Sequence, residues 1–220
     1  MSRILYSGTR NASSWAMRAW LALKELDIAF EERIVDIRRP QRFDNLTRIG
    51  QFSPPAAVPV LVDGDVVIFD SLAIMEYANE LGGGRLLPAD VRRRAHARSL
   101  LAWQHSGLSS ICARLSFESA FYSQRRAMTP AEQNECARIF KVWEDELRAS
   151  GGPYLLGELS LPDLAFVPAV LRLVAHGPNL EPWPLAKAWG ERLVARPSVQ
   201  QWLREAEGLP PVGLEEYQAA

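Results

Sequence analysis

Residues 58–84, VPVLVDGDVVIFDSLAIMEYANELGGG, carry most of the signals that set the architecture of the amino-terminal part of the chain. Two short runs rich in Val and Ile flank Asp63-Gly64. An Asp-Gly pair between such runs predicts a β-hairpin, because both central positions of the turn favour positive φ. The residues from Ser71 onward predict a helix, which the glycines after Leu81 bring to an end. The expected order is therefore strand, strand, helix.

The sequence before this stretch predicts a strand–helix–strand unit. The segment RILYS, residues 3–7, is a short apolar strand, and AFEERIVDI, residues 29–37, alternates as a second strand would. Between them lie apolar residues at intervals of three and four: Ala16, Ala19, Trp20, Leu23 and Leu26. This spacing predicts a helix, and the two strands are expected to be parallel with a right-handed crossover. A loop with room for a second helix leads on to residue 58.

Beyond residue 80 the signals change from strands to helices. The segment LGGGRLLPAD, residues 81–90, is rich in glycine and contains a proline, as is typical of a domain boundary. After it, Thr129 with Glu132 and Ser160 with Asp163 have the spacing of capping boxes. We therefore predict an α/β domain over residues 1–82 and an all-α domain over residues 83–220, with no strand pairing beyond residue 100.

Composition limits the functions open to the chain. With 220 residues, 48% of them hydrophobic, it can bury a substantial core, and its net charge of -1 argues against a strongly electrostatic nucleic-acid or membrane-surface partner. No apolar run is long enough to span a bilayer, and the first residues lack the pattern of a signal peptide. Cys112 and Cys136 are too few for a disulfide scaffold, and the three histidines are too scattered for a metal site. We therefore expect a cytoplasmic protein with no bound metal.

Four motifs in a fixed order give the chain a family resemblance. They are SSWAMRAWLALK from residue 13, AAVPVL from residue 56, DSLAIMEY from residue 70 and LSLPDLAF from residue 159. Together they resemble the cytosolic glutathione transferases over nearly the whole chain, with features of the zeta and beta classes. The resemblance implies a thioredoxin-like amino-terminal domain, a helical carboxy-terminal domain, glutathione as co-substrate, an acceptor pocket between the domains and a homodimer.

The resemblance also implies which residues hold glutathione. Val58 would pair through its backbone with the cysteine of glutathione, next to a cis bond at Pro59. Asp70 and Ser71 would hold the γ-glutamyl end, although a short polar pair before a helix is also a plain N-cap signature. Many family members carry a basic or amide residue where this sequence has Ala57, so Arg42 or Gln41 is a candidate for the glycyl carboxylate.

The residue that activates the thiol has three candidates at the start of the first helix. Thiolate is the nucleophile, so a hydroxyl donor and the positive end of a helix are expected near the sulfur. An alignment on Arg18 puts the serine position of several classes on Asn11 and a beta-class cysteine position on Ser13. We predict Ser13 as the donor and Asn11 as second donor, with Ser14 as the third candidate. Simple capping of the helix by Ser13 or Ser14 is the competing interpretation.

The acceptor side is less well defined by sequence. The resemblance makes Trp103, His105 and Cys112 candidates for the acceptor pocket, although Trp103 also suits core or dimer packing. The first functional hypothesis is conjugation of glutathione to small electrophiles. Glutathione-dependent cis–trans isomerisation of the maleylacetoacetate type and a non-catalytic, glutathione-binding interaction module are the alternatives.

Overall fold

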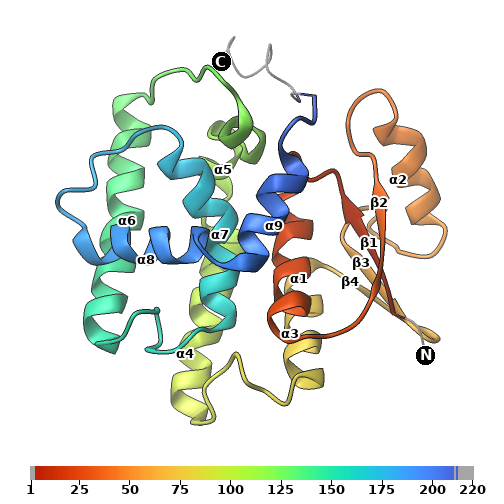
Figure 1. Ribbon diagram of the computed structural model, residues 1–220, viewed down its shortest axis with the longest axis horizontal. Coiled ribbons are helices and arrows are strands. Elements are labelled where there is room, and N and C mark those ends of the chain that lie inside the picture. Colours follow the sequence, from red (N-terminus) through yellow and green to blue (C-terminus); the bar gives the residue numbers. More distant parts are fainter. Residues whose placement is uncertain (1–2, 211, 213–220) are drawn as a thin grey trace.

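The computed structural model describes residues 3–210 and 212 of the chain. Within these residues the amino-terminal part contains a sheet and three helices (Figure 1). The strands are β1 Arg3–Gly8, β2 Glu31–Val35, β3 Val60–Asp63 and β4 Val66–Phe69. The helices are α1 Ser14–Glu25, α2 Arg42–Gly50 and α3 Ser71–Leu81.

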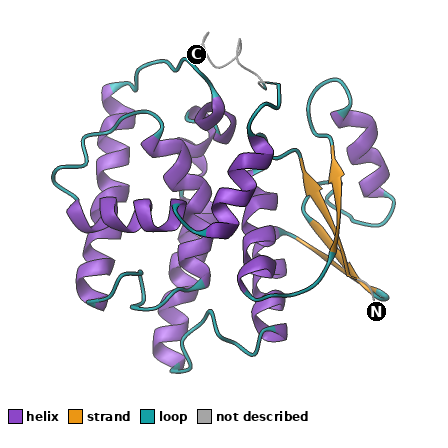
Figure 2. Ribbon diagram, in the orientation of Figure 1, coloured by secondary structure: helices purple, strands orange, loops and turns teal. Residues whose placement is uncertain are grey.

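The sheet has the order β2-β1-β3-β4 (Figure 2). Strands β1 and β2 are parallel, whereas β3 is antiparallel to both β1 and β4. Helices α1 and α3 lie on one side of the sheet and α2 on the other (Figure 1). The parallel pair and the α/β order confirm the prediction of a thioredoxin-like arrangement.

The β3–β4 hairpin confirms the expected element but corrects its turn. Asp63 pairs with Val66, so the two central residues of the turn are Gly64 and Asp65 rather than Asp63 and Gly64. Gly64 has a φ of 64°, and neither aspartate has positive φ. A positive φ at the first central position alone matches a type II′ turn, for which glycine at that position is sufficient.

The rest of the described chain is helical. Its elements are α4 Val91–Ala102, the π-helical turn η1 Trp103–Gly107, α5 Ser109–Arg114, the 3₁₀ turn η2 Phe117–Phe121, α6 Pro130–Ser150, α7 Leu161–Val174, α8 Pro184–Val194 and α9 Pro197–Ala206. Both predicted capping boxes are present, at the starts of α6 and α7. The expectation of no strand pairing beyond residue 100 is wrong in one detail, because isolated β-bridges join Tyr154 to Gly157 and Leu156 to Glu158. These bridges close a tight turn before α7 and form no strand.

Helix α1 joins the two parts of the molecule. Every residue from 16 to 23 is buried, so the helix is enclosed on all sides. It packs against α3 on the sheet side and against α7 and α9 on the helical side. One continuous hydrophobic core therefore runs through both parts.

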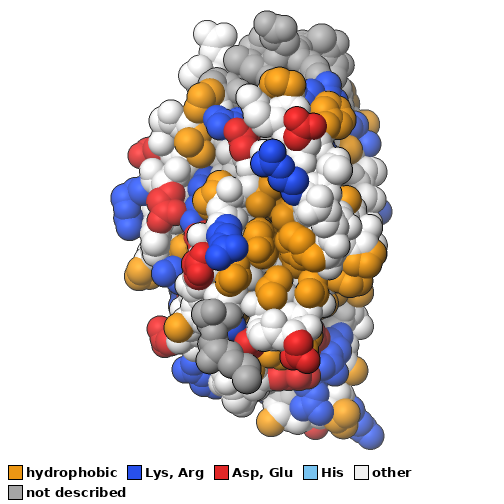
Figure 3. All heavy atoms as spheres, turned by 90° about the vertical axis from the view of Figure 1, so that its right-hand side faces the viewer, with side chains coloured by type: hydrophobic (Ala, Val, Ile, Leu, Met, Phe, Trp, Pro, Cys, Tyr) orange, Lys and Arg blue, Asp and Glu red, His pale blue; other side chains and the backbone are white. Residues whose placement is uncertain are grey.

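The outer face of the sheet carries apolar side chains. Tyr6 of β1 is paired with Val60 of β3, which is paired in turn with Phe69 of β4. The ring of Phe52 lies 5.0 Å from that of Tyr6, and the space-filling view of this side shows hydrophobic side chains gathered at its centre (Figure 3). No helix in the described part of the chain has the length and apolarity needed to cross a membrane.

Candidate functional site

The carboxyl end of β1 brings together the first helix and the Val58-Pro59 loop. A Cβ on Gly8 would lie 2.5 Å from Cβ of Ser13 and 3.0 Å from Cγ2 of Val58, so only glycine permits this approach. The Val58–Pro59 peptide bond is cis, as the resemblance implies. Val58 is half-buried, and among the described residues neither its N–H nor its C=O has a hydrogen-bond partner. This backbone is therefore free to pair with a ligand.

The start of α3 supplies a second set of unpaired polar groups. Asp70 is the N-cap of α3, with a φ of 77°, and one of its carboxylate oxygens accepts a 2.7 Å hydrogen bond from the N–H of Leu72. Ser71 is 1% exposed, and its Oγ has no partner among the described residues. A buried hydroxyl without a partner is costly, and at a helix N-terminus it suits an anionic ligand.

The three candidates for thiol activation occupy different positions at the start of α1. Ser13 is the N-cap, 3% exposed, and its Oγ accepts a 3.2 Å hydrogen bond from the N–H of Ala16. Asn11 is 2% exposed, and its Nδ2 donates to the carbonyl of Pro210 at 2.9 Å. Ser14 is half-buried, on the first turn of the helix. The capping expected of Ser13 is present, and its hydroxyl proton remains available to a second acceptor.

The π-helical turn carries His105 to the start of α3. Nε2 of His105 lies 3.4 Å from a carboxylate oxygen of Asp70, and its ring meets that of Trp15 edge-on with centroids 5.0 Å apart. Nδ1 of His105 is buried and has no partner in the described part of the chain. The sequence suggested His105 for the acceptor pocket. Its position beside Asp70 puts it next to the residues that the resemblance assigns to the γ-glutamyl end.

Two further candidates lie in the helical part, and Arg42 lies on α2. Trp103 packs on Phe166 with ring centroids 5.5 Å apart, which is core packing. Cys112 is a half-buried free thiol on α5. Arg42, exposed at the start of α2, is near enough to Glu118 to help lower the pKa of that carboxyl, which burial raises overall.

Arg18 and Trp15 belong to the site as well. The guanidinium carbon of Arg18 lies 4.0 Å from the centre of the Trp15 ring, and Nη1 donates to Oε1 of Gln104. Burial lowers the pKa of Arg18 to about 9, and the charge of Asp70 partly opposes this. No local pattern in the sequence marks Arg18, because its partner Gln104 lies 86 residues away along the chain.

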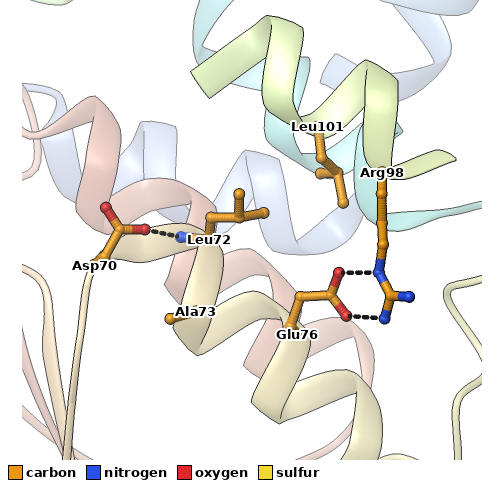
Figure 4. A pocket seen from close by; sticks show the side chains of 6 residues that line it. All are labelled: Asp70, Leu72, Ala73, Glu76, Arg98 and Leu101. Carbon is orange, nitrogen blue, oxygen red and sulfur yellow. Dashed lines mark hydrogen bonds and ion pairs between the residues drawn. The ribbon is translucent and has the colours of Figure 1, made fainter. Parts of the chain in front are cut away.

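Two cavities flank these groups. One, of about 410 Å³, lies between α3 and α4 and is lined by Asp70, Leu72, Ala73, Glu76, Arg98 and Leu101 (Figure 4). Within this lining, Nε and Nη2 of Arg98 donate hydrogen bonds of 3.0 and 3.1 Å to the two carboxylate oxygens of Glu76. The other, of about 380 Å³, is lined by Thr9, Arg10, Glu32, Ile34, Asp36, Arg38, Glu205 and Leu209. Among the described residues no group of three or more His, Cys, Asp or Glu side chains could hold a metal ion.

Comparison with known proteins gives one consistent answer. Residues 12–81 match the family of the glutathione S-transferase N-terminal domain, and residues 101–197 match that of the C-terminal domain. The chain is 33% identical over 218 residues to glutathione S-transferase Z1 of Arabidopsis thaliana, with 92% of each chain covered. It is 28% identical over 198 residues to a probable maleylacetoacetate isomerase 2 of Drosophila melanogaster, covering 89% of this chain and 85% of the relative.

A solved structure extends the match to three dimensions. A glutathione transferase homologue from Burkholderia, crystallised with bound glutathione, aligns with a TM-score of 0.70 and 28% identity over 96% of this chain and all of that one. The sheet order and the helical part accord with these matches. The chain belongs to the glutathione S-transferase family.

Proposed function

We propose that the protein binds glutathione at the junction of α1, the Val58-Pro59 loop and α3, and joins the glutathione sulfur to a small electrophile. The observation that carries the proposal is the meeting of Ser13 and Val58 at Gly8, with the unpartnered Ser71 hydroxyl at the neighbouring helix start. These groups offer the backbone pairing, the anion site and the helix N-terminus that a bound peptide thiol needs.

Each part of glutathione has a partner in this proposal. The N–H and C=O of Val58 pair with the backbone of its cysteine. Ser71 donates through its hydroxyl and N–H to the γ-glutamyl carboxylate, while the Asp70 carboxylate faces the amino group. Arg42 is the candidate for the glycyl carboxylate.

The protein lowers the pKa of the glutathione thiol and orients its sulfur toward the electrophile. The unpaired N–H groups at the start of α1 favour a negative charge on the sulfur, and the Ser13 hydroxyl donates to it. The thiolate then attacks the electrophilic carbon, where a sulfur–carbon bond forms as the leaving group departs with its electron pair. Asn11, two positions before this donor, and Ser14, one position after it, are the alternatives.

The similarity to a probable maleylacetoacetate isomerase favours a second candidate function on the same site. In that reaction the thiolate adds to a carbon–carbon double bond, the resulting single bond rotates, and the thiolate leaves again. The requirements at the start of α1 are the same for both reactions. What differs is the acceptor, for which the half-buried Cys112 is the proposed contact, since Trp103 packs in the core and His105 lies beside Asp70.

The proposal also covers the organisation of the molecule. All the strands of the sheet lie before residue 70 and the glycines follow α3, which supports a domain boundary near residues 82–83.

We propose a homodimer through the α3–α4 face, where the 410 Å³ cavity and the Arg98–Glu76 pair lie.

Calorimetric titration with glutathione tests the function. We expect saturable binding, and we expect Ser71→Ala to weaken it about tenfold, through loss of a charge-assisted hydrogen bond. Ser123→Ala, at an exposed serine outside the site, is the matched control and should bind as the wild type does. Wild-type protein that binds no glutathione would refute the proposal. Glutathione binding with no turnover of any electrophile would favour the interaction module.

A further inference from the structure

Arg10, in the loop between β1 and α1, is held by several elements at once. It is 6% exposed, and its Nη2 forms ion pairs of 2.5 Å with Glu32 of β2 and 2.8 Å with Glu205 of α9. Its guanidinium carbon lies 4.1 Å from the ring centre of Trp202 on α9 and 5.0 Å from that of Trp20 on α1. The side chain therefore ties the loop to one strand and to two helices.

Helix α9 and the residues after it hold this loop at three points. Nε1 of Trp202 donates a 3.0 Å hydrogen bond to the carbonyl of Arg10, and Nε of Arg10 donates one of 3.0 Å to Glu205. The side chain of Asn11 donates to the carbonyl of Pro210. Helix α9 lies beside α1 (Figure 1), so the loop that opens α1 rests on a segment from the far end of the chain.

A closed turn connects Arg10 to Ser13. The N–H groups of Ala12 and Ser13 both donate to the carbonyl of Thr9, each at 2.9 Å. Thr9 is itself fixed, because its Oγ1 accepts a 3.0 Å hydrogen bond from the N–H of Ile37. The position of the Ser13 hydroxyl therefore depends on how this turn, and Arg10 within it, is held.

Glu205 is the accessible member of the cluster. Its side chain is 40% exposed, and together with Arg10 it lines the 380 Å³ cavity. The buried charge of Arg10 stays compensated without it, because Glu32 is a second carboxylate partner. Nε1 of Trp20 donates to Glu32 at 3.1 Å, so that carboxylate is held independently of α9. What Glu205 adds is the direction of the Arg10 side chain and its link to α9.

We propose that Arg10 and Glu205 are positioning residues for thiol activation, because their ion pair ties the loop to α9 and so holds the Ser13 hydroxyl within hydrogen-bond distance of the glutathione sulfur. The inference rests on the proposed function and adds to it two residues that act through the loop. Without Glu205 the loop can shift, and the hydroxyl donates to the thiolate less often. The pKa of the bound thiol then rises, while Val58 and Ser71 still bind glutathione.

Thiolate absorbance against pH, with glutathione saturating, measures this pKa in wild type, Glu205→Ala and Glu205→Gln. We expect Glu205→Ala to raise the pKa of bound glutathione by about 0.5, a change of about threefold in the ionisation constant. Glu205→Gln keeps an oxygen that accepts from Nε of Arg10 and should restore part of the wild-type value. Calorimetric titration should show glutathione affinities within about threefold of the wild type for both variants.

The sign of the change separates positioning from a direct effect of charge. Removal of a negative charge near the sulfur would by itself lower the thiol pKa, since a carboxylate disfavours the thiolate. A lower pKa in Glu205→Ala therefore overturns the inference. An unchanged pKa overturns it as well, whether or not the melting temperature falls, because the role of Glu205 would then be structural only.

A double variant tests whether Glu205 acts through Ser13. In a Ser13→Ala background, Glu205→Ala should leave the thiol pKa unchanged, because the donor that it positions is gone. A rise as large as in the Ser13 protein overturns the inference. Glu207→Ala, at an exposed glutamate two residues further on, is the matched control and should titrate as the wild type does. Wild-type protein that binds no glutathione refutes the proposed function itself, whereas an unaltered thiol pKa in Glu205→Ala refutes this inference alone.

Discussion

Ser13 has one hydroxyl group for two tasks. Its oxygen accepts a hydrogen bond from the Ala16 N–H and so caps α1. The hydroxyl hydrogen can rotate to donate to a second acceptor. The two tasks are compatible, because capping uses a lone pair and thiolate stabilisation uses the proton. Substitution of Ser13 should therefore have two separate consequences, one for stability and one for the thiol.

We predict that Ser13→Ala lowers the free energy of unfolding by about 1 kcal/mol and raises the pKa of bound glutathione. The stability loss comes from the missing cap and is measured by urea denaturation. The pKa is measured from thiolate absorbance against pH with glutathione saturating. Ser14→Ala and Asn11→Ala are the comparison variants, and we expect the largest upward shift for Ser13. If all three variants titrate as the wild type does, activation comes from the helix N-terminus alone.

Glu132, at the start of α6, makes the stability of the fold depend on pH. Its side chain is 2% exposed and accepts hydrogen bonds from Arg126 at 2.8 Å and from the Thr129 N–H at 2.9 Å. The hydrogen bonds from Arg126 are the main cause that lowers the pKa of Glu132 to about 2, below its ordinary value of 4.5. Because the folded-state pKa is depressed, this stabilisation is complete above pH 4.5 and is lost as the pH falls toward 2.

We predict that Glu132→Gln lowers the free energy of unfolding by about 1.5–3 kcal/mol at pH 7, the range for hydrogen bonds to a charged group. The difference from wild type should shrink between pH 4.5 and pH 2, where the wild-type carboxylate takes up its proton. Urea denaturation at several pH values measures it. A difference that stays constant down to pH 2 would contradict the assignment.

At the scale of single residues, local motifs single out more of the proposed glutathione side of the site than of the proposed acceptor side. Val58 and Ser71 follow from local signals, a proline at a strand start and a polar pair at a helix start, and both have unpaired groups in the structure. Arg18, by contrast, is buried against Gln104, a contact that joins distant parts of the sequence. No local pattern carries that information.

At the scale of elements, Asp163 fixes the start of α7 to the rest of the helical part. Its buried carboxylate accepts hydrogen bonds from the N–H of Leu155, from the N–H and hydroxyl of Ser160, and from Nε1 of Trp189. Three segments of chain therefore meet on one side chain. The sequence predicted the capping box, while the contacts with Leu155 and Trp189 come from tertiary packing.

We predict that Asp163→Ala lowers the free energy of unfolding by about 3–5 kcal/mol, because it leaves several buried donors without an acceptor. Urea denaturation measures the loss. Asp145→Ala, at an exposed carboxylate on α6, is the control and should change stability by less than about 0.5 kcal/mol. An Asp163→Ala variant as stable as that control would contradict the prediction.

The turn between β3 and β4 shows where element prediction loses accuracy. The hairpin itself followed from two apolar runs around Asp63-Gly64, but the pairing of Asp63 with Val66 set the register. The register depends on which side chains pack against strand β1 and against the core. A two-residue turn signal does not contain that information.

At the scale of the whole molecule, α1 makes the two parts interdependent. Its buried surface faces α3 on one side and α7 and α9 on the other. Arg196, at the start of α9, donates a hydrogen bond to the carboxylate of Glu25, the last residue of α1. The sequence predicted a sheet part and a helical part, and both are present. It did not predict that one helix would lie in the core of both.

We predict that the full chain unfolds in a single cooperative transition and that residues 1–82 alone do not fold. Without the helical part, the side of α1 that carries Trp20 would face water, and burial of such a side chain contributes about 2–3 kcal/mol. Scanning calorimetry of the chain and circular dichroism of the fragment measure these outcomes. A fragment that melts cooperatively by itself would show that the parts are independent.

We also predict a dimer in solution, with a mass twice the 24.6 kDa of the chain by light scattering at micromolar concentration. A mass near 24.6 kDa would contradict it.

The contact between Asn11 and the Pro210 carbonyl bears on how the protein should be handled at the bench. A fusion attached shortly after Pro210 would disturb this contact, and with it the loop that leads into α1. Strand β1 starts at Arg3 and ends at Gly8, so the amino end of the described chain lies a full strand length from this loop (Figure 1). Purification through an amino-terminal tag is therefore the safer basis for every binding and titration experiment described above.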